Sequence, residues 1–86
     1  SIVLECVASN VAKEITKSLK IPTIGIGASI HCDGQILVTD DMLGLSGFYP
    51  RFVKKFAKLN YVIEKGVQKY NKAVLKKKFP HKVNEF

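Results

Sequence analysis

The feature that most constrains this chain is a short run, "QILVT" at residues 35–39, with three apolar residues at its centre. A strand with one solvent-exposed face alternates apolar and polar residues, whereas a strand buried on both faces is a continuous run of apolar residues. Residues 2–4 and 23–27 show the same pattern. Such strands belong to parallel sheets that are covered by helices or closed into a barrel. The chain therefore carries strands typical of a sheet much larger than 86 residues can form.

A helix is predicted between the first two of these strands. Ser9 and Asn10 are helix N-cap types, and Pro22 stops the helix because the residue before a proline avoids the α region. The apolar residues between them recur at helical spacing, at Val11, Ala12, Ile15 and Leu19. Strand, helix and strand within about 30 residues form a βαβ unit.

Two helices are predicted in the C-terminal part of the chain. Pro50 suits the first turn of one helix, whose apolar stripe is formed by Phe52, Phe56 and Leu59. Asn60 is placed to cap a second helix over about residues 61–78. The apolar stripe of that helix consists of Ile63, Val67, Tyr70 and Val74.

Three two-sided strands need cover on both faces, and these few helices cannot supply it. Parallel strands left alone would also expose unpaired edges. We therefore expect an α/β chain that is part of something larger, with residues 1–48 holding strands and a helix, and residues 49–86 holding C-terminal helices of the same domain.

The net charge of +7 is unevenly distributed, since residues 21–49 contain no Lys or Arg. A basic module for nucleic acid is one reading, but the lysines lack an aromatic stacking platform, so we expect no nucleic-acid partner. Cys6 and Cys32 are too few for a disulfide scaffold and lack zinc-ligand spacing, which fits free thiols in the cytoplasm. No apolar run approaches the roughly 18 to 20 residues of a membrane span, and we expect no membrane partner.

Four acidic residues follow strands or turns. Glu5 ends an apolar strand, where a carboxylate is costly to bury unless it is paired or functional, although it could also lie in a polar loop. Asp33 before a glycine is most simply a turn residue. Asp40 and Asp41 could bind a metal or cap the turn that follows, and capping is favoured. The glycines at residues 25 and 27 do not complete a dinucleotide fingerprint, because no third glycine and no helix follow.

Taken together, these segments resemble one family, ketopantoate hydroxymethyltransferase. The resemblance runs in order along essentially the whole chain. The matching text is "LECV" from residue 4, "AKEIT" from residue 12, "IPTIGIGA" from residue 21, "DGQILV" from residue 33, "DMLGL" from residue 41 and "PRFVKKF" from residue 50. Ser29 and Thr39 depart from it, standing where the family usually has glycine and often histidine.

The resemblance implies the C-terminal third of a (βα)8 TIM barrel, a fold of about 250 residues, with residues 35–39 as its eighth strand. It implies transfer of a one-carbon unit from 5,10-methylenetetrahydrofolate to 3-methyl-2-oxobutanoate, which makes ketopantoate for pantothenate and coenzyme A synthesis. In such an enzyme Mg²⁺ polarises the oxo-acid carbonyl, and its ligands are expected outside this chain.

The resemblance makes Glu5 the proton acceptor, partly withdrawn from water at the catalytic rim. It places Ile26, Ile36 and Val38 on an apolar wall around the branched carbon of the substrate, although the same residues could be ordinary barrel-core layers. It also implies a homo-oligomer that exchanges the last helix. A different enzyme of the phosphoenolpyruvate/pyruvate barrel group is the nearest alternative.

Overall fold

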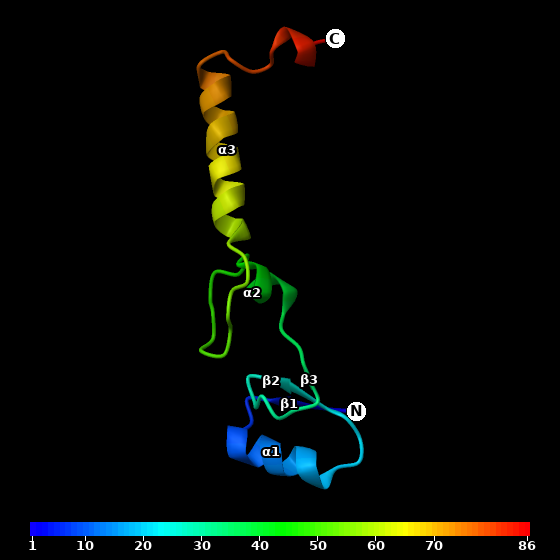
Figure 1. Ribbon diagram of the computed structural model, residues 1–86. Helices are drawn as coiled ribbons and strands as arrows, with labels where there is room; N and C mark the ends of the chain where they lie inside the picture. Colours follow the sequence, from blue (N-terminus) through cyan, green and yellow to red (C-terminus); the bar gives the residue numbers. More distant parts are fainter.

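A computed structural model describes residues 1–86 and shows an elongated molecule (Figure 1). Its principal extents are 66 × 25 × 13 Å, and its radius of gyration is 21.5 Å. A compact domain of this length would have a radius of gyration of about 12 Å. A small sheet with one helix lies at one end and a long helix projects from the other, so most of the chain has no second layer to pack against.

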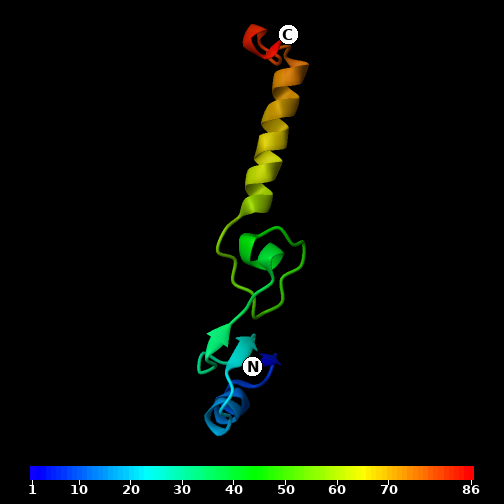
Figure 2. The same ribbon diagram turned by 90° about the vertical axis from the view of Figure 1, so that its right-hand side faces the viewer.

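The sheet has three parallel strands in the order β1-β2-β3, as predicted. These are β1 (Ile2–Glu5), β2 (Thr23–Ile26) and β3 (Gly34–Gln35). Helix α1 (Ser9–Ser18) connects β1 to β2 and covers one face of the sheet (Figures 1 and 2). The predicted βαβ unit is therefore confirmed.

Strand β3 is shorter than the predicted strand over residues 35–39. One further ladder bond follows it, from the Ile36 N–H to the Gly25 carbonyl at 3.0 Å. Strand β2 then ends, because Gly27 adopts a left-handed conformation with φ of 60°. With no strand on its other side, the segment leaves the sheet, and Thr39 begins helix α2 (Thr39–Leu43) instead of ending a strand.

The core is small and lies between the sheet and α1. Leu4, Ala12 and Cys32 form its buried cluster, and only eight of the 86 residues are buried. On the opposite sheet face the cover is incomplete, because Val3 is 51% exposed and Ile36 is 49% exposed. The prediction that this chain alone cannot cover both faces of its strands is confirmed.

The helix predicted from Pro50 is not formed, which corrects the sequence-based expectation. Residues 45–58 instead make a loop that returns to α2, where the Phe56 N–H donates to the Met42 carbonyl at 2.8 Å. The physical reason is that the apolar stripe has no surface to bury against, and the Phe56 side chain stays 68% exposed. Most helical stability in proteins comes from packing of such a face, which is missing here.

The long helix α3 spans Leu59–Leu75, followed by a short 3₁₀ turn, η1 (Lys82–Asn84). Lys58 occupies the N-cap position, so Asn60 lies inside the first turn and is not the cap. No residue of α3 is buried, and the four stripe side chains expose between 42% and 56% of their surface. The stripe therefore contacts no part of residues 1–45 closely enough to be buried. None of the helices combines the length and hydrophobicity needed to cross a membrane.

Candidate active site

Glu5 is the last residue of β1 and pairs with Ile26 of β2. The backbone turns sharply after it, because Cys6 has a φ of 53° while its N–H still donates to the Ile26 carbonyl at 2.9 Å. The Glu5 side chain is exposed, so the expected partial withdrawal from water is wrong for these 86 residues. The cover that is missing is that of the second sheet face, opposite α1, on which Glu5 lies.

Three of the four candidate residues lie in one row across the sheet. Leu4 packs against α1, so its neighbour Glu5 lies on the opposite face, since successive residues of a strand face opposite ways. Glu5 is in register with Ile26, and the pairing of Gly25 with Gln35 brings Ile36 beside Ile26. One carboxylate and two branched apolar side chains thus share the carboxyl end of the three strands.

Val38, the fourth candidate, lies beyond the last strand residue as the N-cap of α2, and is 55% exposed. Ile26 is the only one of the three apolar candidates that is buried. Ile26 and Ile36 therefore lie side by side at the strand ends, while Val38 leads the chain away from the sheet.

Asp40 and Asp41 lie in the first turn of α2, where the helix dipole favours negative charge. Neither is the cap, because Val38 occupies that position without a side-chain hydrogen bond, so capping in the strict sense was wrong. Asp41 accepts a hydrogen bond from the Ser46 hydroxyl. No three Asp, Glu, His or Cys side chains gather anywhere in the chain, so these residues do not fit a metal site.

A cavity of about 530 Å³ lies at the carboxyl ends of β1 and β2. Residues 6–9 and 27–28 line it from the sheet side, and Arg51 and Phe52 close it from the loop. Figures 1 and 2 show this loop, between α2 and α3, reaching back toward the sheet. Sequence reasoning missed Arg51 and Phe52, because it placed them on a helix. The signal available was their position inside the motif "PRFVKKF".

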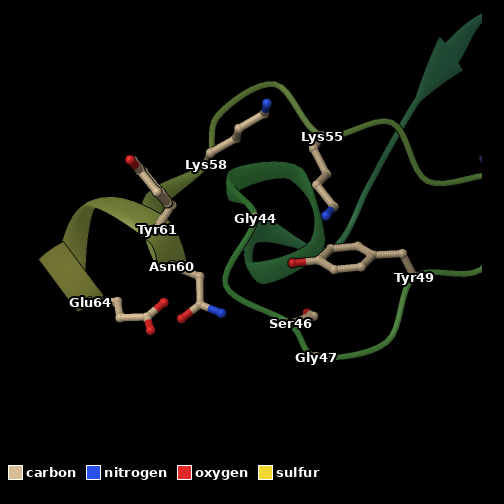
Figure 3. A pocket seen from close by; sticks show the side chains of 9 residues that line it. All are labelled: Gly44, Ser46, Gly47, Tyr49, Lys55, Lys58, Asn60, Tyr61 and Glu64. Carbon is tan, nitrogen blue, oxygen red and sulfur yellow. The ribbon is translucent and has the colours of Figure 1, made fainter.

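A second cavity, of about 320 Å³, is built entirely from residues 44–64 and takes nothing from the sheet. Figure 3 shows Asn60 and Glu64 of α3 on one side and Tyr49 with Lys55 on the other. The Lys55 ammonium lies 3.9 Å from the centroid of the Tyr49 ring, a cation–π contact. This cavity mixes both signs of charge and is separate from the row that contains Glu5.

A known protein family matches this chain over most of its length. The profile described as ketopantoate hydroxymethyltransferase matches residues 1–82. The chain belongs to the ketopantoate hydroxymethyltransferase family. The resemblance first seen in short motifs therefore holds over almost the whole chain.

Curated members of the ketopantoate hydroxymethyltransferase family are similar at more than half of the aligned positions. A 3-methyl-2-oxobutanoate hydroxymethyltransferase of Pelagibacter ubique is 55% identical over 86 residues, which are 100% of this chain and 34% of that protein. One from Chlorobaculum parvum is 56% identical over 81 residues, 93% of this chain and 29% of that protein. A 3-methyl-2-oxobutanoate hydroxymethyltransferase 2 of Zymomonas mobilis is 55% identical over 84 residues, which are 98% of this chain and 31% of that protein. The chain spans about a third of the length of these relatives.

Proposed function

We propose that these residues are the closing part of a (βα)8 barrel enzyme that acts in the cytoplasm. This enzyme transfers a hydroxymethyl group from 5,10-methylenetetrahydrofolate to 3-methyl-2-oxobutanoate and makes ketopantoate for pantothenate and coenzyme A synthesis. Membership of the family supports the reaction. The parallel βαβ arrangement, with one sheet face open, supports the barrel.

The observation that carries the proposal is the row of Glu5, Ile26 and Ile36 at the carboxyl end of parallel strands. Active sites of (βα)8 barrels lie at that end. In the proposed reaction the Glu5 carboxylate accepts the proton of substrate carbon C3, which frees that carbon to bond to the one-carbon unit. The two isoleucines contact the methyl groups that C3 carries.

No three Asp, Glu, His or Cys side chains come together among these 86 residues as ligands for Mg²⁺. We therefore assign its ligands to the earlier strands of the barrel and derive no step through it here. Those strands also supply the cover that Glu5 lacks in this chain. The exposed stripe of α3 is assigned to contact with another subunit of a homo-oligomer.

The proposal is tested by assaying the 86-residue chain alone and together with a separately expressed earlier part of the barrel. Ketopantoate formation is followed with Mg²⁺, the oxo acid and 5,10-methylenetetrahydrofolate present, and exchange of the C3 hydrogen in heavy water is followed without the folate. We expect no turnover for the chain alone and turnover for the reassembled protein. Turnover by the chain alone at the level of a complete enzyme refutes the fragment interpretation. Activity of the reassembled protein on isocitrate or phosphonopyruvate instead points to another barrel enzyme of the phosphoenolpyruvate/pyruvate group.

A further inference from the structure

The cavity at the carboxyl ends of β1 and β2 is a neighbour of the proposed catalytic row but not part of it. Cys6, which lines the cavity, directly follows Glu5, and Gly27 directly follows Ile26. Both backbones turn there with positive φ, 53° at Cys6 and 60° at Gly27. On two adjacent strands, the residue directly after the catalytic row thus lines the cavity.

The far wall of this cavity comes from the loop and is held by a close contact. A Cβ added to Gly27 would lie 2.6 Å from Cγ of Phe52, so the ring covers a position where only glycine fits. This contact fixes the neighbouring residue, Arg51, at the mouth of the cavity. A flat apolar ring and a guanidinium therefore face one space together.

The cavity has a cation without a counter-charge. The only ion pair in the chain joins Lys17 to Glu14, on the surface of α1. None of the residues that line the cavity is acidic, and no hydrogen bond occupies the Arg51 side chain. A guanidinium in this situation is suited to a carboxylate, which it can bind through two parallel N–H donors.

We propose that this cavity binds the aminobenzoyl-glutamate end of the folate co-substrate, with Phe52 against its ring and Arg51 on a carboxylate. The inference rests on the proposed function and names the part of its site that takes the co-substrate. The volume of about 530 Å³ suits a ligand of that size, because pockets for such molecules measure about 300 to 1,000 Å³. A five-carbon oxo acid would leave most of it empty.

The test uses the complete enzyme and two variants that each remove one positive charge from the same loop. Arg51→Gln removes the cation that lines the cavity, whereas Lys54→Gln removes one that lines neither cavity. Each protein is assayed with 5,10-methylenetetrahydrofolate and with the corresponding pteroate amide, which lacks the glutamate and carries no carboxylate. Exchange of the C3 hydrogen of the oxo acid, measured without folate, reports on the fold and on the oxo-acid site.

We expect Arg51→Gln to raise KM for methylenetetrahydrofolate by about 10- to 100-fold, as for the loss of a charge-assisted hydrogen bond. KM for the pteroate amide, KM for the oxo acid and the exchange rate should stay at parent values. Lys54→Gln should match the parent in every assay. Arg51→Lys should show a smaller rise in KM for methylenetetrahydrofolate than Arg51→Gln, because lysine keeps the positive charge but lacks the parallel N–H donors of the guanidinium.

An unchanged folate KM in Arg51→Gln, with the parent fully active, overturns the inference and leaves the proposed function intact. A rise in KM for the oxo acid instead assigns Arg51 to the oxo-acid carboxylate and also overturns it. Loss of the exchange reaction in both Arg51 variants shows that Arg51 acts in the fold or in the oxo-acid site, and this result also overturns the inference. A parent enzyme that neither transfers nor exchanges refutes the proposed function, and the inference with it.

Discussion

One carboxylate oxygen of Asp33 accepts two hydrogen bonds from Thr23, from its backbone N–H at 2.8 Å and from its hydroxyl at 3.2 Å. The hydroxyl of Thr23 also lies 2.9 Å from that of Thr16 on α1. Thr23 is fully buried, so these partners replace the water that its polar groups lose. Asp33 therefore ties the start of β2 to the residue before β3, and it is more than the turn residue that the sequence predicted.

Replacing Asp33 with alanine should lower the free energy of unfolding of the complete enzyme by about 1 to 3 kcal/mol. The buried N–H of Thr23 would keep no acceptor, and an unsatisfied buried donor costs about that much. Asp33→Asn retains a carbonyl oxygen at the same place and should cost less. Urea unfolding curves measure both variants, and equal stability of Asp33→Ala and the parent would contradict the proposed tie.

Gly44→Ala should destabilise the enzyme by more than 1 kcal/mol, an order of magnitude set by the left-handed backbone alone. Gly44 has a φ of 75°, and an added Cβ would collide with the carbonyl oxygen of Ala57, which belongs to the backbone. Gly47→Ala is the matched control, because nothing lies within 4 Å of its added Cβ. Thermal unfolding compares the two, and similar losses in both would argue against this account.

Glu5→Gln should slow turnover of the complete enzyme by about 10² to 10⁴, the usual contribution of a positioned base. Binding of the oxo acid should change little, since we assign the metal ligands to other strands. Exchange of the C3 hydrogen in heavy water, measured without folate, isolates the proton-transfer step. If the variant exchanges that hydrogen at the parent rate, Glu5 is not the base, and its carboxylate instead orients the new hydroxyl or the folate.

Val67→Asp should weaken assembly of the complete enzyme. Val67 is in the middle of the exposed stripe of α3, and a carboxylate there would have to be desolvated on contact with a partner subunit. Gln68→Asp adds the same charge at the next exposed position and should assemble normally. Sedimentation measures the distribution of oligomers. Unchanged assembly of Val67→Asp would show that the stripe is not the subunit contact.

The elements that the sequence predicted correctly are those whose signals are local. Continuous apolar runs, helical spacing and Pro22 were enough for β1, α1 and β2, because each of these packs against a neighbour close in sequence. The helix expected from Pro50 had a good stripe but no surface to meet, so residues 45–58 follow backbone contacts with α2 instead. No pattern in the sequence reports such a missing surface.

The residues of the candidate site likewise fall into those that the sequence could predict and those that it could not. Glu5, Ile26 and Ile36 could be predicted to share one sheet edge, because the register of parallel strands aligns their ends. Phe52 and Gly27 are 25 positions apart and come into contact because an irregular loop returns to the sheet. The periodicity of the sequence does not predict such a contact. The bonds between Asp33 and Thr23 were missed for a similar reason, since a turn residue was a sufficient reading of Asp-Gly.

The order β1-β2-β3 leaves two outer edges that differ from each other. Copies that join with β3 of one against β1 of the next do so head to tail, and this contact repeats without a twofold axis. A head-to-tail series either curls until its ends meet or continues as an open filament. Where a chain of this kind lacks its earlier strands, the two edges that would complete a closed ring are therefore the places where another copy can pair.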